Sequence, residues 1–126
     1  MRKKILVIDD SEIDLKIIET VLKAAGYAEI TLASSGEEGI TGAQSSPPDL
    51  AVIDTNLPGL DGFETCKKLK SIPAGAIYVI MITGNIETVD AWKARKSGAD
   101  DYVVKTADYS PLLEALKNAG GDPHEP

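Results

Sequence analysis

Four short apolar runs divide the chain at regular intervals, at Ile5–Ile8, Leu50–Ile53, Tyr78–Ile82 and Tyr102–Val104. Nearly continuous apolar runs of this length, rich in β-branched residues, are typical of strands covered on both faces. A fifth segment, Glu29–Ala33, alternates polar and apolar residues and predicts a half-exposed strand at a sheet edge. The five segments begin near positions 4, 29, 50, 77 and 101, which leaves room for a helix after each strand.

The intervals between these segments carry helical signals. Gly26 stands where the cap of a first helix belongs, and the pairs Ser34–Glu37 and Asp61–Glu64 have the spacing of capping boxes that open a second and a third helix. The first helix is further indicated by apolar residues at helical spacing, namely Ile13, Leu15, Ile17, Ile18, Val21, Leu22 and Ala25.

The last two helices have weaker signals. Asn85 can cap a fourth helix whose apolar stripe is thin. Asp108 or Ser110 opens the fifth, with Pro111 in its first turn, and Gly120–Gly121 ends it. Strand and helix therefore alternate five times, which predicts an α/β fold with a doubly wound, five-stranded parallel sheet. The edge-like character of the second strand favours the strand order 2-1-3-4-5. We expect one domain over residues 1–121 and a polar tail or linker stub over 122–126.

Composition narrows the possible functions. The chain has 126 residues, 43% of them hydrophobic, and a net charge of −7, which disfavours direct binding to nucleic acid. It has one cysteine, Cys66, and one histidine, His124, so neither a disulfide framework nor a zinc knuckle is predicted. No apolar run approaches the roughly 20 residues that cross a bilayer, so we expect no membrane association and a cytoplasmic protein.

Polar residues stand directly after four of the predicted strands. They are Asp9, Asp10, Asp54, Thr83 and Lys105. The fold places these positions at one edge of the sheet, where ligands of such folds bind. Each residue alone is an ordinary strand-end residue, but three clustered carboxylates repel one another unless a cation is present. One Mg²⁺ together with Lys105 would balance the three, and a carboxylate can attack phosphorus to form an aspartyl phosphate.

The segment Leu50–Gly62 resembles the phosphorylation segment of bacterial two-component response-regulator receiver domains. It carries the family's element Asp-x-x-x-Pro-x-x-Asp-Gly, and the acidic pair, the threonine and the lysine follow in the family's order and spacing. The resemblance covers residues 3 to about 119 and is closest to single-domain, chemotaxis-regulator-like members. It implies a flavodoxin-like (βα)5 fold and a role in phosphorelay signal transduction rather than as an enzyme in the usual sense. Such a chain catalyses its own phosphorylation and its slow dephosphorylation.

The resemblance also implies roles for individual residues. Asp54 would be the phosphoacceptor. Asp10 would bind Mg²⁺ (or Mn²⁺) directly and Asp9 mainly through water, while Asp54 and the backbone carbonyl of Asn56 complete the protein ligands. The donor would be a histidine kinase or a phosphotransfer protein, and the output would pass to a downstream protein effector.

Three further residues would respond to the phosphoryl group. Thr83 would hydrogen-bond to it, Lys105 would pair with it, and Tyr102 matches the family's aromatic switch position. The altered surface would comprise the fourth helix, the fifth strand and the fifth helix. Thr106 departs from the family, which usually has a proline after a cis bond at this position, so the bond from Lys105 to Thr106 is either cis or the loop differs.

Two alternatives compete with this interpretation. A haloacid-dehalogenase-type hydrolase also has an aspartate at the end of a parallel strand, but it needs a second aspartate two residues later, where this chain has Asn56. A pseudo-receiver would keep the fold as a protein-binding module without phosphorylation. The complete acidic set argues against this alternative, and Thr106 argues for it.

Overall fold

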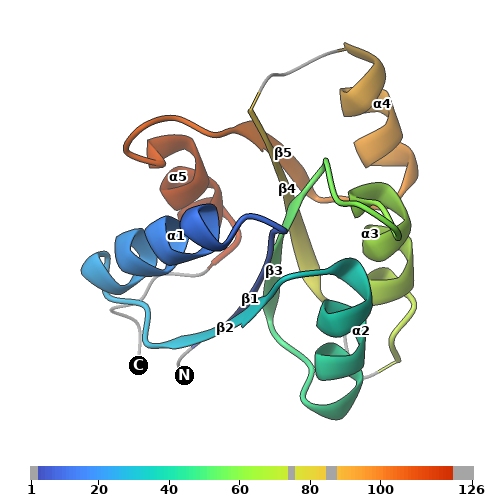
Figure 1. The fold of residues 1–126 in the computed structure, drawn as a ribbon, viewed down its shortest axis with the longest axis horizontal. Coiled ribbons are helices and arrows are strands. Elements are labelled where there is room, and N and C mark those ends of the chain that lie inside the picture. The colour runs from blue at the N-terminus through green and yellow to red at the C-terminus, as the bar shows by residue number, and fades with distance from the viewer. Residues whose placement is uncertain (1–2, 74–75, 85–87, 121–126) are drawn as a thin grey trace.

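Strands and helices alternate five times in this computed structural model, which describes residues 3–73, 76–84 and 88–120 (Figure 1). The predicted alternation is confirmed. The strands are β1 (Lys4–Ile8), β2 (Glu29–Ala33), β3 (Leu50–Asp54), β4 (Tyr78–Thr83) and β5 (Asp101–Val104). The helices are α1 (Glu12–Ala24), α2 (Gly36–Ser45), α3 (Gly62–Lys70), α4 (Thr88–Lys96) and α5 (Ser110–Asn118).

The strands form one parallel sheet in the order β2-β1-β3-β4-β5, as the sequence predicts. β1 has two neighbours, with Ile8 opposite Ala33 of β2 and Ile53 of β3. After β1 the chain forms β2 at one edge of the sheet, and it then returns to form β3 on the opposite side of β1. The strand order therefore reverses between β1 and β3, and their carboxyl ends flank the crevice where such sheets bind ligands.

Helices cover both faces of the sheet (Figure 1). α1 and α5 lie on one face, and α2, α3 and α4 lie on the other. Alternate residues of β1 join different cores: Ile5 and Val7 pack with the α1 and α5 side chains, whereas Leu6 and Ile8 pack with those of α2 and α3. β3 is buried along its whole length, because a central parallel strand is covered on both faces. Its carboxyl end therefore has a rigid support.

The apolar stripe predicted for α1 is partly wrong. Leu15, Ile18 and Leu22 are buried, but Ile13 is 74% and Ile17 is 40% exposed. Successive residues of a helix are about 100° apart, so Ile13 lies about 200° around the helix from Leu15. The predicted stripe merged two faces of the helix, of which only one meets the sheet.

Two of the predicted helix ends are confirmed. Asp61 caps α3 by accepting a hydrogen bond from the backbone N–H of Glu64 at 2.8 Å. Gly26 follows α1 with a φ of 104°, a conformation that glycine adopts without steric cost. Pro111 also lies in the first turn of α5, as expected. Asn85, predicted to cap α4, lies outside the described residues.

Two other caps are shifted by one residue. The cap of α2 is Ser35, whose hydroxyl accepts from the backbone N–H of Glu38 at 3.1 Å, whereas Ser34 donates to the Glu38 side chain. Both serines have a glutamate three residues later, so spacing alone cannot separate them. At α5 the cap position is occupied by Tyr109 with a φ of 55°, between the two candidates Asp108 and Ser110.

Candidate functional site

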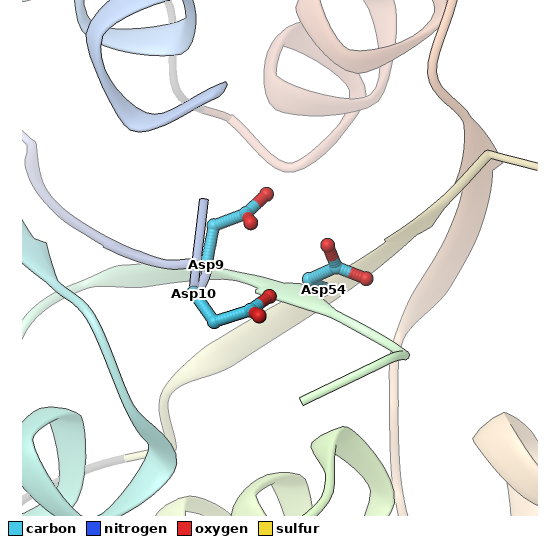
Figure 2. A group of neighbouring side chains, drawn as sticks. All are labelled: Asp9, Asp10 and Asp54. Carbon is cyan, nitrogen blue, oxygen red and sulfur yellow. The ribbon is translucent and has the colours of Figure 1, made fainter. Parts of the chain in front are cut away.

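The carboxyl ends of β1 and β3 bring three carboxylates together (Figure 2). One carboxylate oxygen from each of Asp9, Asp10 and Asp54 lies within 4.8 Å of those of the other two. Asp9 is fully buried and Asp54 is 8% exposed, whereas Asp10 lies at the surface. The predicted acidic cluster is therefore present. Its donors are all oxygens and are close enough to share one hard cation, so they fit Mg²⁺.

The buried carboxylates are held by their own loops. Oδ1 of Asp9 accepts from the backbone N–H of Ser11 at 3.0 Å, and Oδ1 of Asp54 accepts from the backbone N–H of Asn56 at 2.9 Å. Each hydrogen bond spans two residues, the pattern by which aspartate stabilises a turn. Each carboxylate is thereby oriented through one oxygen, and its second oxygen faces Lys105.

Lys105 provides the positive charge of the site. Its Nζ donates to Oδ2 of Asp9 at 2.8 Å and to Oδ2 of Asp54 at 3.0 Å. The Lys105 backbone N–H donates to the Thr83 carbonyl at 2.7 Å, which continues the pairing of β5 with β4 beyond the last strand residue. The sequence prediction that Lys105 joins the aspartates is confirmed in its geometry.

The electrostatics of Lys105 and Asp9 reflect their burial. Burial alone lowers the pKa of Lys105, but its hydrogen bonds to Asp9, Asp54 and Asp14 outweigh this effect and raise the pKa above its ordinary value. Burial raises the pKa of Asp9, although the hydrogen bond from Lys105 opposes that rise. Lys105 is therefore fully protonated at neutral pH and compensates carboxylates that water reaches poorly.

Sequence reasoning missed Asp14. Its Oδ2 accepts a hydrogen bond from Lys105 Nζ at 3.0 Å, and its side chain is 35% exposed. From the sequence Asp14 is only an acid in the first turn of α1, where it favours the helix dipole. The sequence prediction balanced three carboxylates against one Mg²⁺ and one lysine. It therefore left out one negative charge, that of Asp14.

Thr83 and Tyr102 lie on one face of the sheet. Tyr102 stands opposite Met81, and Thr83 follows Met81 by two residues, so the three side chains share a face. Thr83 is buried. Tyr102 is half-buried, and its hydroxyl has no hydrogen-bond partner among the described residues. Tyr102 also lines a groove of about 310 Å³ between α4 and β5.

The loop after β5 differs from the family pattern. No cis peptide bond occurs among the described residues, so Lys105 and Thr106 are joined by a trans bond. The Thr106 hydroxyl donates to Oδ1 of Asp108 at 3.0 Å, and that oxygen also accepts from the backbone N–H of Ser110 at 3.0 Å. These hydrogen bonds to Ser110 and Thr106 lower the pKa of Asp108. Side-chain hydrogen bonds thus shape a loop in which the family usually has a proline.

Within the described ranges, no helix is long and apolar enough to cross a membrane.

Sequence comparison identifies relatives. The family described as "Response regulator receiver domain" matches residues 5–117. The "Alkaline phosphatase synthesis transcriptional regulatory protein PhoP" of Bacillus subtilis is 42% identical over 105 residues, which are 83% of this chain and 43% of that protein. The "Probable transcriptional regulator ycf27" of Cyanophora paradoxa is 42% identical over 115 residues, 90% of this chain and 46% of that protein. The chain spans less than half the length of these two curated relatives.

Solved structures agree with the sequence matches. A putative response regulator from Chloroflexus aurantiacus superposes with a TM-score of 0.86 at 30% identity, covering 94% of this chain and 98% of that one. The chemotaxis response regulator CheY4 of Vibrio cholerae gives a TM-score of 0.85 at 27% identity, covering 94% and 99%. Receiver domains of this family are not enzymes in the usual sense. On the match over residues 5–117, and with this fold and acidic site, the chain belongs to the response regulator receiver domains of two-component systems.

Proposed function

We propose that this chain accepts a phosphoryl group on Asp54 and that residues 1–121 act as one signalling domain. The observation that carries the proposal is the pairing of Lys105 Nζ with both Asp9 and Asp54 beside a cluster of three carboxylates. Asp9, Asp10, Asp54 and the backbone carbonyl of Asn56 would hold Mg²⁺. The bound ion would neutralise phosphoryl oxygens, because phosphoryl transfer depends on positioning and charge compensation more than on proton transfer.

The chemical step is a substitution at phosphorus. A carboxylate oxygen of Asp54 forms the new bond, and the bond from phosphorus to the donor breaks with its electron pair leaving on the donor. A phosphohistidine of a histidine kinase or phosphotransfer protein, or a small acyl phosphate, fits this role. Lys105 Nζ stands 3.0 Å from Oδ2 of Asp54 and would compensate the negative charge that the phosphoryl oxygens bring into the pocket.

We infer that the signal leaves through α4, β5 and α5. Phosphorylation adds three phosphoryl oxygens that carry up to about two negative charges, a net gain of about one because Asp54 loses its own charge, and these oxygens would draw Thr83 and Lys105 toward the phosphoryl group. Thr83 and Tyr102 share a sheet face, so movement of Thr83 opens space on the side where Tyr102 packs. Trp92 on α4 is 61% exposed and contributes apolar surface for a downstream protein effector. The change is a shift between two pre-existing states.

A pseudo-receiver that binds proteins without phosphorylation is the second candidate. The observation in its favour is the trans bond before Thr106, which sets the loop carrying Lys105 apart from the family pattern. The complete set of carboxylates, each within reach of the others, favours phosphorylation.

Incubation with acetyl phosphate and Mg²⁺, followed by intact mass measurement, separates the two candidates. We expect the wild type to gain one phosphoryl group, and we expect Asp54→Asn or added EDTA to abolish the gain. Asp49→Asn is the matched control, because Asp49 lies at the opposite end of the sheet, where it accepts from the Lys4 backbone N–H at 2.8 Å. An unchanged wild-type mass, under conditions that label a known receiver, would establish the pseudo-receiver.

A further inference from the structure

Asp14 is the acid of α1 that turns toward the site. Its Oδ2 lies 3.0 Å from Lys105 Nζ, although Asp14 does not belong to the cluster formed by Asp9, Asp10 and Asp54. Glu12, the other acid in the same helical turn, is exposed and forms no ion pair with Lys105. Contact with Lys105 is therefore specific to Asp14 and is not shared by every first-turn acid of the helix.

Asp14 closes a ring of hydrogen bonds. Ser11 donates its backbone N–H to Oδ1 of Asp9 at 3.0 Å, and its hydroxyl accepts from the backbone N–H of Asp14 at 3.2 Å. Lys105 Nζ completes the ring by donating to Asp14 and to Asp9. The start of α1, the end of β1 and the end of β5 are thereby linked through four side chains. The position of Lys105 thus depends on α1 as well as on its own loop.

The other two partners of Lys105 are the residues whose bonding changes during the proposed reaction. Asp9 and Asp54 would turn oxygens toward a cation, and one oxygen of Asp54 would become bonded to phosphorus. Both events remove acceptors from Lys105, whereas Asp14 stays available. We propose that Asp14 is a positioning residue, which keeps the ammonium of Lys105 at the pocket while Asp9 and Asp54 change partners. This proposal rests on the proposed function.

The loop after β5 gives such a tether a purpose. Proline restricts the backbone at a fixed φ, but this chain has Thr106 after Lys105 and a trans bond between them. Lys105 is a long side chain with four rotatable carbon segments, and holding it in one place costs conformational entropy. Asp14, the third carboxylate that Lys105 contacts, offsets this entropic cost because it anchors the ammonium to α1.

The first test observes the lysine itself. In ¹⁵N-labelled protein with saturating Mg²⁺, the Lys105 ammonium resonance, assigned from its loss in Lys105→Arg, reports how well Nζ is held. We expect a sharp resonance in the wild type, in Glu12→Gln and in Asp14→Glu, and a resonance broadened by faster hydrogen exchange in Asp14→Asn. An equally sharp resonance in Asp14→Asn would overturn the proposal. If the Lys105 resonance were broadened equally in Glu12→Gln, the effect would come from the negative charge at the start of α1 and not from the contact with Asp14.

The second test is a double-mutant cycle on the rate of phosphorylation by acetyl phosphate at saturating Mg²⁺. We expect Asp14→Asn to lower the maximal rate roughly threefold to tenfold, the effect of losing one partly exposed hydrogen bond to a charged group. In a Lys105→Met background the same change should have no further effect, because its target is gone. Equal factors in the two backgrounds would show that Asp14 acts on its own charge and not through Lys105.

The two tests separate this proposal from the proposed function. A wild type that gains no phosphoryl group contradicts the phosphoacceptor role, and the ammonium resonance still decides whether Asp14 holds Lys105. A wild type that is phosphorylated normally, with Asp14→Asn indistinguishable from it in both measurements, contradicts the positioning role alone.

Discussion

Asp10 differs from its two neighbours in the acidic cluster. It is exposed, and Lys105 pairs with Asp9, Asp14 and Asp54 but not with Asp10. Its charge lies close to two other carboxylates without a cation of its own among the described residues. On the proposed function, Asp10 would destabilise the metal-free fold through repulsion and stabilise the Mg²⁺-bound one, an example of the trade-off between stability and function.

Asp10→Asn should therefore stabilise the metal-free protein. We expect an increase of only about 0.5 kcal/mol in the free energy of unfolding, because Asp10 is exposed and water screens its repulsion by the two buried carboxylates. Urea denaturation in EDTA measures this change, and repetition with Mg²⁺ should reverse the order, since the variant binds the ion poorly and gains less from it. Glu29→Gln, an exposed acid on β2, is the control for a general charge effect. A variant less stable than the wild type in EDTA would contradict this account of Asp10.

At the scale of elements, α3 approaches the site through Gly62. A Cβ added there would lie 2.3 Å from the backbone carbonyl oxygen of Asp54 and 2.9 Å from Cα of Thr55. Neither atom can move without shifting β3, so the first turn of α3 touches the backbone of Asp54 only because residue 62 lacks a side chain. The glycine that follows the helix cap thus sets the distance between helix and strand.

Gly62→Ala should separate α3 from the end of β3. We expect a loss of about 1–3 kcal/mol in the free energy of unfolding, the usual cost of overpacking. Gly42→Ala on α2 is the matched control, because a Cβ there meets nothing within 4 Å. Alanine at that helical position should be neutral or stabilise by up to about 1 kcal/mol. Urea denaturation of both variants checks the difference, and equal stabilities would contradict the contact at Gly62.

The elements of this fold were easier to predict than their ends. A buried strand such as Leu50–Asp54 can be recognised by its run of apolar residues. The alternation of polar and apolar residues in β2 is typical of an edge strand and indicated the strand order. Ser34 and Ser35 could not be separated, because each has a glutamate three residues later and the choice depends on how α2 packs. The left-handed φ of 55° at Tyr109 has no local signal, since a tyrosine adopts it only under tertiary constraint.

The site, too, could be predicted only in part from the sequence. Asp9 and Asp10 directly follow β1 and Asp54 ends β3, and a parallel sheet brings the ends of its strands together whatever the details of packing. Asp14 does not end a strand, and its contact with Lys105 spans 91 residues. A long lysine side chain can reach several directions, so only the three-dimensional arrangement shows which acids it meets.

At the scale of the whole molecule, Cys66 reports on the integrity of the fold. Its thiol is fully buried on the inner face of α3, and Sγ donates to the Ser97 carbonyl oxygen at 3.4 Å. Burial raises the pKa of the Cys66 thiol, which reduces the reactive thiolate further. Because the chain has one cysteine, every labelling event comes from this position.

Alkylation of Cys66 by iodoacetamide should therefore follow unfolding. We expect slow labelling of the native protein, rapid labelling in urea, and slower native labelling when Mg²⁺ is added, because an ion that binds the folded state lowers the unfolded population. Intact mass against time measures the rate, with a short peptide containing the same cysteine as the unprotected reference. Native labelling as fast as that of the peptide would show that α3 detaches without global unfolding.

The sharing of the site among four strand ends has one more consequence. Asp9 follows β1, Asp54 ends β3, Thr83 ends β4 and Lys105 follows β5. No single hairpin, strand–helix unit or half of the chain contains both the acids and their lysine. A nascent chain still emerging during synthesis, or a proteolytic fragment, would thus carry no competent acceptor. On the proposed function, only completely folded molecules could accept phosphoryl groups from a donor, and damaged copies would not consume them.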